Sequence, residues 1–321
     1  MNSFLKNRIF IVAIFGPTAV GKSRIAADVA QALDGEIVSA DSMQLYVGLP
    51  VLTDQPDAGL LKAVRHHLVG IIPLEEEYSA GRYAKEAGGI IRDINGRKKL
   101  PLVVGGTGLY IRALLGGFSF AGKGDRQARN KWEELVKEHG TAAAMAQLNL
   151  LDPEAAAAID SRNHRRLVRV LEAAEGKSPQ ESFERDRLWS SDSPYGVLCI
   201  GLVESRDELN RRIDERVDTM LTGGVIDEVN KARRMTVSRT VSQAIGFKDI
   251  CEYLDGQASL ADTAVSIKRK SRRYAKRQLT WMRKMPDIVR IDLAGRLASE
   301  AAEEIIELIG SHRQNPPTDG F

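Results

Sequence analysis

The chain contains very little cysteine. Its 321 residues include two cysteines, Cys199 and Cys251, which lie far apart in the sequence. Secreted domains that depend on disulfides need many paired cysteines, and structural zinc sites need closely spaced cysteine and histidine ligands. The sequence therefore excludes a disulfide framework and a cysteine-based metal site, and we expect a protein of the reducing cytoplasm.

Long apolar segments and an excess of one charge are also absent. No apolar run approaches the ~20 residues that a membrane helix needs, so we expect no membrane partner. The run at residues 9–15 (IFIVAIF) is followed by a glycine-rich motif where a signal peptide would have its cleavage site, so it reads as a buried strand. With 46 basic and 43 acidic residues the net charge is +3, and the total charge alone points to no class of partner.

The glycine-rich motif, GPTAVGKS at residues 16–23, has the pattern of a phosphate-binding loop. In such a loop, backbone N–H groups and the N-terminus of the following helix hold a phosphate anion. Lys22 adds a positive charge, and the Ser23 hydroxyl can bind Mg²⁺. The apolar run before the motif and the helical pattern after it match the structural context that this loop requires.

A carboxylate is missing where an ordinary ATPase of this class would have one. Such enzymes hold Mg²⁺ with an acid at the end of a neighbouring apolar strand. The best candidate strand, residues 100–104 (LPLVV), is followed by Gly-Gly-Thr-Gly. An acid follows a different strand, at Asp41, so the sequence does not favour the ATPase interpretation.

Strand and helix patterns alternate in the first half of the chain. Continuous apolar runs predict strands, and helical periodicity predicts helices between them. This order predicts an α/β fold with a parallel sheet flanked by helices. The expected strands are residues 9–15, 36–39, 100–104, 195–202 and 288–291, and the expected helices include residues 23–33, 82–95 and a long one at 204–229.

The pattern changes in the middle of the chain, where residues 124–192 show helical signals and no convincing strand. We therefore expect an all-helical insertion domain at 119–194 within a core domain made of residues 1–118 and 195–312. Residues 313–321 carry the polar, proline-containing composition of a disordered tail.

Seven motifs in a fixed order now point to one family. They are GPTAVGKS at 16–23, DSMQLY at 41–46, HHL at 66–68, VGGTGLYI at 104–111, RRLVRVLE at 165–172, AIGFKD at 244–249 and RRYAKRQLTW at 272–281. In these motifs the chain resembles the bacterial tRNA dimethylallyltransferases, also called tRNA isopentenyltransferases. The resemblance covers about residues 10–310 and implies a P-loop fold similar to that of nucleotide kinases.

The resemblance also implies a reaction. The dimethylallyl group of dimethylallyl diphosphate would be transferred to the exocyclic amine of the adenosine next to the anticodon of tRNA, with Mg²⁺ as cofactor. The phosphate loop would then hold the diphosphate of the prenyl donor instead of ATP. We expect the protein to act as a monomer on these two partners.

Family positions imply roles for individual residues. The resemblance implies that the diphosphate is bound by Gly16, Thr18, Ala19, Val20, Gly21, Lys22, Ser23 and Arg216. Asp41 matches the carboxylate that takes a proton from the adenine amine, and Thr107 matches a hydroxyl near the metal and the entering base. Ser23 and Thr107 are the expected Mg²⁺ ligands.

Further positions are implied to contact tRNA, and several of them lie in a strongly basic segment. Residues 268–284 (KRKSRRYAKRQLTWMRK) carry nine basic residues and no acid, a pattern that suits RNA phosphates better than a solvated helix face. The implied tRNA contacts are Asp41, Ser42, Met43, Gln44, Thr107, Arg129, Arg165, Arg166, Leu167, Val168, Arg169, Gln243, Ala244, Ile245, Gly246, Phe247, Lys248, Arg272, Lys276, Arg277, Gln278 and Arg283.

The chain departs from the family pattern beside the segment that would receive the adenosine. Val47 stands where the family has an arginine, and Leu52-Thr53-Asp54-Gln55-Pro56 replaces Gly-Thr-Ala-Lys-Pro. Two basic side chains are therefore absent there, which puts the tRNA affinity in question. His66 and His67 would point to opposite sides of an extended segment, so we expect them to be structural or close to the substrate and not metal ligands.

Two other functions fit parts of the sequence. A nucleotide or small-molecule kinase could use the same phosphate loop, but it would not need the basic segment or the insertion. An RNA-binding protein without activity would not need Lys22 and Asp41, and both are present.

Overall fold

The computed structural model describes residues 8–116, 126–161, 163–176, 193–285 and 287–314. The chain folds into two compact units, one formed by Met1–Phe118 with Trp189–Phe321 and a second formed by Ser119–Leu188. No helix in the described ranges is long and apolar enough to cross a membrane.

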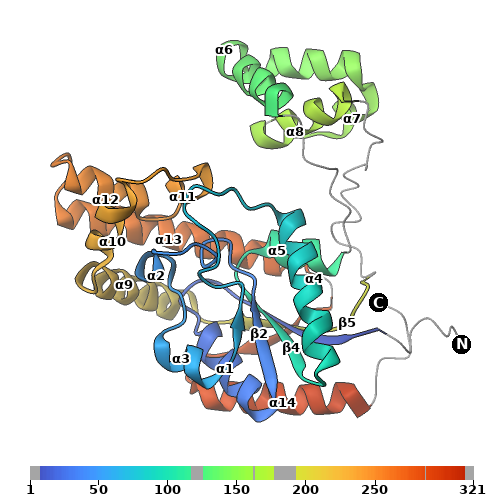
Figure 1. The fold of residues 1–321 in the computed structure, drawn as a ribbon, viewed down its shortest axis with the longest axis vertical. Helices are drawn as coiled ribbons and strands as arrows, with labels where there is room; N and C mark the ends of the chain where they lie inside the picture. The colour runs from blue at the N-terminus through green and yellow to red at the C-terminus, as the bar shows by residue number, and fades with distance from the viewer. Residues whose placement is uncertain (1–7, 117–125, 162, 177–192, 286, 315–321) are drawn as a thin grey trace, which may run out of the picture. The chain divides into compact units, whose positions relative to one another are not determined.

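The first unit is built on a six-stranded parallel sheet (Figure 1), which confirms the predicted α/β class. The strand order is β3-β2-β4-β1-β5-β6. The strands are β1 Phe10–Phe15, β2 Gly35–Ser39, β3 His66–His67, β4 Leu100–Gly105, β5 Gly196–Val203 and β6 Val289–Asp292. Only the two-residue β3 was not expected from the sequence.

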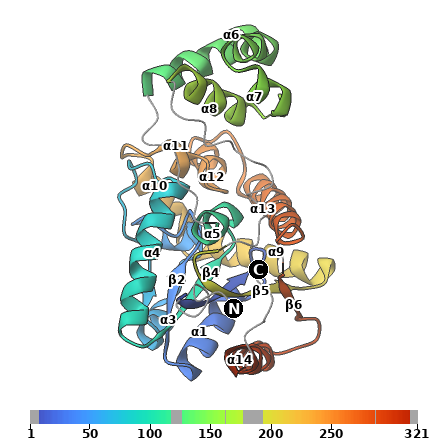
Figure 2. The ribbon, with the colours of Figure 1, turned by 90° about the vertical axis from the view of Figure 1, so that its right-hand side faces the viewer.

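Helices cover both faces of this sheet, because alternate residues of β1 point to opposite sides. Ile11 and Phe15 belong to one buried apolar cluster, and Val12 and Ile14 belong to the other. Figures 1 and 2 show α1 beside α14 and α4 beside α5. These helices are α1 Lys22–Ala32, α4 Ala80–Gly96, α5 Gly108–Leu115 and α14 Ala298–Gln314.

The remaining helices of this unit follow β2 and β5. They are α2 Pro50–Thr53, α3 Ala58–Ala63, α9 Arg206–Thr222, α10 Val225–Ala232, α11 Arg239–Ser242, α12 Phe247–Leu254 and α13 Leu260–Met282. The long helix predicted at 204–229 is wrong in one respect, because it is divided into α9 and α10. Gly224 has a φ of 98°, a left-handed conformation that ends the helical path and that glycine tolerates best.

Parallel strands place the loops that carry the predicted site at one edge of the sheet. β1 pairs with β4, and Phe15 lies opposite Gly105. β2 pairs with the other side of β4, and Ser39 lies opposite Val104. The phosphate loop, the segment at Asp41 and the Gly-Gly-Thr-Gly turn therefore all begin at the carboxyl edge, where α/β proteins bind their ligands.

The described part of the second unit is helical. It contains α6 Arg126–Leu151, which is kinked at Gly140 (φ 77°), α7 Pro153–Ala158 and α8 His164–Glu175. Trp132, Leu148, Leu167 and Leu171 form its buried apolar core. In the first unit, α14 continues through Arg313 and Gln314, so these two residues of the predicted tail are helical, and residues 315–321 lie outside the described part.

Candidate active site

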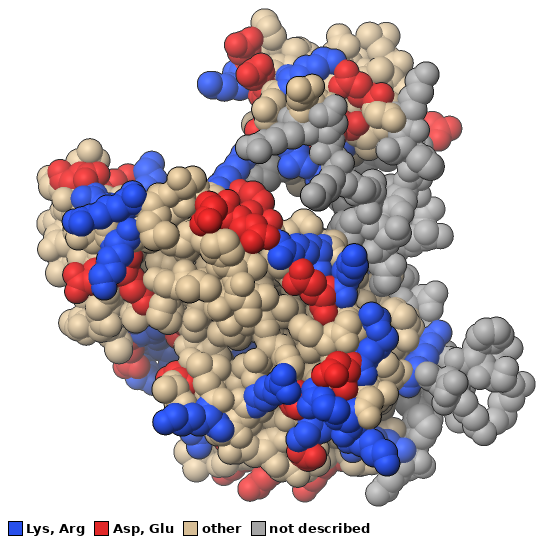
Figure 3. Space-filling model, viewed as in Figure 1, with Lys and Arg blue, Asp and Glu red and all other residues tan. Residues whose placement is uncertain are grey.

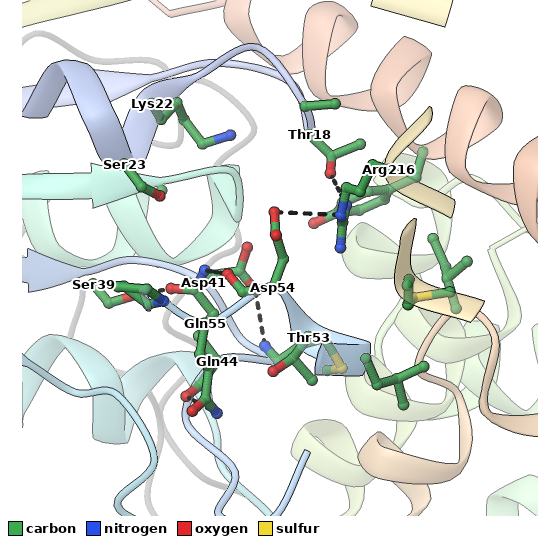
Figure 4. A pocket seen from close by; sticks show the side chains of 18 of the residues that line it. Thr18, Lys22, Ser23, Ser39, Asp41, Gln44, Thr53, Asp54, Gln55 and Arg216 are labelled. Atoms are coloured by element: carbon green, nitrogen blue, oxygen red, sulfur yellow. Dashed lines mark hydrogen bonds and ion pairs between the residues drawn. The ribbon is translucent and has the colours of Figure 1, made fainter. Parts of the chain in front are cut away.

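A cavity of about 840 Å³ lies at the carboxyl edge of the sheet, and all its lining residues belong to the first unit. Figure 4 shows Lys22, Asp41 and Arg216 around it, contributed by three different parts of the chain. Predicted site residues that line it are Thr18, Ala19, Gly21, Lys22, Ser23, Asp41, Ser42, Met43, Gln44, Arg216, Gln243, Ala244, Ile245, Arg277 and Gln278.

The phosphate loop has the backbone shape that its sequence predicts. Ala19 and Gly21 have φ values of 63° and 97°, and α1 begins at Lys22 with no side chain capping its N-terminus. The free N–H groups of that helix end can therefore bind an anion. Gly16 packs closely against the buried Val20 within the loop, because a Cβ at Gly16 would lie only 3.0 Å from a methyl carbon of Val20.

Lys22 is held at the base of the cavity. Its Nζ donates a hydrogen bond to the carbonyl oxygen of Pro17 at 2.7 Å. Burial lowers the pKa of Lys22 to about 8, and the negative charges of Asp41 and Asp54 oppose this shift. Because burial removes water from the ammonium group, its charged form is less stable than in solution, and a bound phosphate anion would stabilise it.

Arg216 of α9 reaches the phosphate loop from another direction. Its Nη1 donates a hydrogen bond to the Thr18 hydroxyl at 2.5 Å, and its Nε lies 3.3 Å from a carboxylate oxygen of Asp54 (Figure 4). Lys22 and Arg216 thus bring two cations to one loop, as expected for a site that binds linked phosphates.

Asp41 provides a carboxylate in the same cavity. Its Oδ1 accepts a hydrogen bond from the Met43 backbone N–H at 3.0 Å. Burial raises the pKa of Asp41 above its usual value, although the Met43 hydrogen bond and the charges of Lys22 and Arg216 lower it again. A carboxylate whose proton affinity is raised in this way is suited to accept a proton from a substrate.

Thr107 is connected to this carboxylate through Ser42. The Thr107 Oγ1 accepts a hydrogen bond from the Ser42 backbone N–H at 3.0 Å and donates to the Ser42 hydroxyl at 3.4 Å. The predicted residues of the loops after β2 and β4 are therefore brought together, as their sheet positions require.

Close packing explains why the turn after β4 is made of glycines. A Cβ at Gly105 would lie 2.2 Å from the Ala40 carbonyl oxygen, and one at Gly106 would lie 2.0 Å from the Gln278 side chain. A Cβ at Gly108 would lie 2.7 Å from the Trp281 ring. The turn is confined between the loop after β2 and helix α13, so these positions have no room for a carboxylate.

Helix α13 exposes part of the predicted RNA-binding set. Arg272, Lys276, Arg277 and Arg283 are exposed, although Arg272 forms an ion pair with Asp214. Gln278 is an exception, because it is only 3% exposed and its amide group is bonded inside the protein. This burial leaves little of the Gln278 side chain open to a partner, and its contact with RNA stays a prediction.

The segment at 243–248 also contains both exposed and buried residues. Gln243 and Lys248 are exposed, Ile245 is half-buried, and the side chains of Ala244 and Phe247 are in the core. Phe247 packs in the apolar core, whereas Ala244 also lines the cavity, and the contact of both residues with RNA stays a prediction. Gly246 has a φ of 96° and packs against Leu52, so glycine is required there by the backbone.

In the second unit, two predicted arginines share one acidic partner. Glu172 lies 3.3 Å from Arg129 and 3.4 Å from Arg169, which is half-exposed. Leu167 and Val168 are buried in the core of this unit, and their contact with RNA stays a prediction. Arg166 is half-buried, and the side chain of Arg165 lies outside the described part of the chain.

The face drawn in Figure 3 carries basic and acidic side chains interspersed. This mixture agrees with the nearly balanced total charge. The basic residues of α13 are thus a local feature and do not reflect a general excess of positive charge.

The segment that departs from the family pattern takes part in the site, which the sequence did not reveal. Glu228 of α10 accepts hydrogen bonds from the backbone N–H groups of Val51 and Leu52 at the start of α2. Gln55 donates to the carbonyl oxygens of Gln44 and Tyr46 at 3.1 and 2.8 Å. These contacts hold Asp54 beside Arg216, and no local motif could have predicted them.

The two adjacent histidines have different environments, as expected. His67 Nε2 lies 2.8 Å from the buried carboxylate of Glu36, and His66 lines the cavity with its Nδ1 2.8 Å from the Val64 carbonyl oxygen. In the described ranges, no group of three or more histidine, cysteine, aspartate or glutamate side chains is placed to hold a metal ion.

Comparison with known proteins places the chain in a family. The sequence model of the IPP transferase family matches residues 44–285, and that of isopentenyl transferase matches residues 9–72. The chain belongs to the IPP transferase family. It is 42% identical to the tRNA dimethylallyltransferase of Bacillus velezensis over 281 residues, which cover 86% of this chain and 88% of that protein. The tRNA dimethylallyltransferase of Geobacter sulfurreducens is also 42% identical, over 87% of this chain and 90% of that protein.

Solved structures of transferases have the same fold as this IPP transferase family member. The tRNA isopentenylpyrophosphate transferase of Bacillus halodurans matches with a TM-score of 0.72 and 36% identity, over 96% of this chain and 98% of that one. A eukaryotic dimethylallyltransferase acting on tRNA matches with a TM-score of 0.81 and 27% identity, over 96% of this chain and 80% of that one.

The pKa of Lys22 predicts how anion binding depends on pH. Above pH about 8 the free lysine loses its charge, so the affinity for inorganic diphosphate should fall by up to about tenfold per pH unit. Titration calorimetry from about pH 7 to about pH 9 measures this, with Lys22→Arg as the control because arginine keeps its charge. The ratio of the wild-type affinity to the Lys22→Arg affinity should decline with pH, and a constant ratio would contradict the assignment.

The Asp54–Arg216 ion pair predicts a second effect. Asp54 competes with a bound anion for Arg216 and repels the anion directly, so Asp54→Ala should bind inorganic diphosphate about three to ten times more tightly. Asp218→Ala is a matched control, since Asp218 has a similar exposure, pairs with Lys268 and does not line the cavity. Equal affinities of the Asp54→Ala and wild-type proteins would show that the carboxylate does not compete.

Proposed function

We propose that this chain transfers the dimethylallyl group of dimethylallyl diphosphate to the exocyclic amine of the adenosine next to the anticodon of tRNA. The observation that carries the proposal is that a phosphate-binding loop and a half-buried carboxylate line the same cavity. Lys22 and Arg216 are at the phosphate loop, and Asp41 lines the same cavity. No observation favours the alternative of a kinase, because β4 ends in a confined glycine turn without a carboxylate.

The cations act on the leaving group. As the bond between the allylic carbon and the diphosphate oxygen breaks, its electrons pass to the diphosphate, and the carbon becomes cation-like. Lys22, Arg216 and the N-terminus of α1 stabilise the negative charge that grows on the diphosphate. Because the loop is already shaped by Ala19 and Gly21, little reorganisation is needed during the reaction.

Asp41 acts on the adenosine. The amine nitrogen forms the new bond to the allylic carbon and loses a proton, which the Asp41 carboxylate accepts. The raised pKa of Asp41 makes it a stronger base than an exposed aspartate. The base must leave its stack to reach this cavity, as in other enzymes that modify bases, and Ser42, Met43 and Gln44, which line the cavity, would contact it.

Mg²⁺ fits the hydroxyl groups that are present. Ser23 lines the cavity and can offer its hydroxyl oxygen, whereas Thr107 is not among the lining residues and would have to exchange its hydrogen bonds with Ser42 to offer a second oxygen. Mg²⁺ is commonly bound through substrate phosphates, water and only one or two protein groups, and the absence of an acidic cluster in the described residues agrees with that mode. When bound, the metal would supply further positive charge to the diphosphate.

Basic side chains that reach the solvent support the binding of tRNA phosphates. In the first unit these are the exposed Arg272, Lys276, Arg277, Arg283 and Lys248, and in the second unit the exposed Arg169 and the half-buried Arg129. We also propose that the protein acts as a monomer in the cytoplasm. The two free cysteines, Cys199 and Cys251, support a reducing compartment.

The direct test uses unmodified tRNA, dimethylallyl diphosphate and Mg²⁺. After incubation the tRNA is digested and its nucleosides are weighed by mass spectrometry. We expect one adenosine to gain the mass of the five-carbon group and inorganic diphosphate to be released in equal amount. Unchanged nucleosides with consumption of added ATP would favour a kinase.

Substitution of Asp41 separates its base role from RNA binding. Asp41→Asn should lower kcat by about 10²- to 10⁴-fold, because the amide cannot accept the proton. It should change the Kd for tRNA by less than about threefold, since the amide keeps the size of the side chain and can accept the Met43 hydrogen bond. Single-turnover rates and filter-binding affinities measure the two quantities, and equal losses in both would argue against a base.

A further inference from the structure

The Gln278 side chain connects two loops that are distant in the sequence. Its Oε1 accepts a hydrogen bond from the Thr18 backbone N–H at 2.8 Å, in the phosphate loop. Its Nε2 donates a hydrogen bond to the Gly106 carbonyl oxygen at 3.0 Å, in the turn after β4. The side chain is 3% exposed, and its bond to Gly106 is buried while its bond to Thr18 is partly buried.

An amide is well suited to this place. One end must accept from an N–H group and the other must donate to a carbonyl group, and a neutral side-chain amide offers both. A carboxylate could accept from Thr18 but would repel the Gly106 oxygen. Loss of either bond leaves a buried backbone group unsatisfied, which is costly. The amide is closely packed against Gly106, because a Cβ at that position would lie only 2.0 Å from the Gln278 Nε2.

Each of the two loops that Gln278 contacts is connected to a side chain with a proposed role in the reaction, Arg216 for one loop and Asp41 for the other. Thr18 also receives the Arg216 hydrogen bond through its hydroxyl, so its position fixes where the arginine meets the phosphate loop. Gly106 precedes Thr107, whose hydroxyl accepts from the Ser42 backbone N–H next to Asp41. One side chain thus sets the distance between the cations that hold the leaving group and the carboxylate that takes the proton.

We propose that Gln278 is a positioning residue for prenyl transfer and not an RNA contact. Helix α13 then has two roles on two faces. Arg277 and its exposed basic neighbours face RNA, and Gln278 aligns the two loops from the inner face. The second role rests on the proposed function, because alignment matters when two substrates must meet within a few tenths of an ångström.

Two variants test the alignment. Gln278→Met keeps the approximate volume and removes both hydrogen bonds, and it should lower kcat/KM for dimethylallyl diphosphate by about tenfold or more while the tRNA Kd stays within about twofold. Lys276→Ala, two residues away, exposed and outside the cavity lining, is the matched control and should weaken tRNA binding with little effect on inorganic diphosphate binding. A Gln278→Met protein that loses tRNA affinity as Lys276→Ala does, with kcat and donor affinity intact, would overturn the proposal.

Gln278→Glu gives a readout that simple destabilisation would not produce. A protonated carboxyl group has an acceptor oxygen and a donor hydroxyl, as the amide has its oxygen and N–H, and it restores the bond to Gly106. The activity of Gln278→Glu relative to wild type should therefore rise as the pH is lowered from about 8 to about 6. A ratio that stays constant or falls would contradict the role of the amide.

The role of Gln278 can be tested even if the chain does not prenylate tRNA. If the wild-type protein does not prenylate tRNA, the proposed function is wrong. Calorimetry with inorganic diphosphate then still tests the alignment of the phosphate loop, since Gln278→Met should bind this probe more weakly than wild type. Equal binding by the two proteins would overturn the alignment role by itself.

Discussion

The site depends on a steric constraint at the carboxyl edge of the sheet. β1, β2 and β4 are adjacent and parallel, so the loops that follow them must share one small space. Helix α13 packs on these loops, and the turn after β4 can pass only because Gly105, Gly106 and Gly108 have no side chains. Because this turn is confined, the acid of the site has to come from the loop after β2, where Asp41 is found.

The charges in the cavity are arranged for an anion that departs. Lys22 and Arg216 approach the phosphate loop from different elements, and the pKa of Lys22 is lowered by burial. Asp41 lines the same cavity, so the carboxylate proposed as the base and the two cations lie around one space. Asp54 adds a second acid beside Arg216, which reduces the net positive charge available to the diphosphate. This balance differs from that expected of family members with alanine at this position.

The sequence predicted the features that local patterns determine. The phosphate loop was predictable because its glycines, lysine and serine stand at fixed spacings, and the sheet because apolar runs alternated with helices. The pattern at 204–229 predicts one helix, and the division between α9 and α10 depends on the left-handed backbone of Gly224. The burial of Gln278, Leu167 and Phe247 depends on packing between distant segments, which their motifs do not reveal. The ion pair of Asp54 with Arg216 was unpredictable for the same reason.

Competition binding separates a phosphate loop that holds a prenyl diphosphate from one that holds ATP. A fluorescent or radiolabelled dimethylallyl diphosphate is bound to the wild-type protein with Mg²⁺, and unlabelled dimethylallyl diphosphate or ATP is added as competitor. If the loop holds the prenyl diphosphate as a leaving group, dimethylallyl diphosphate competes at least about tenfold more strongly than ATP, and ATP is not consumed when tRNA is added. Tighter binding of ATP, with its turnover in the presence of tRNA, would show that the loop holds ATP instead.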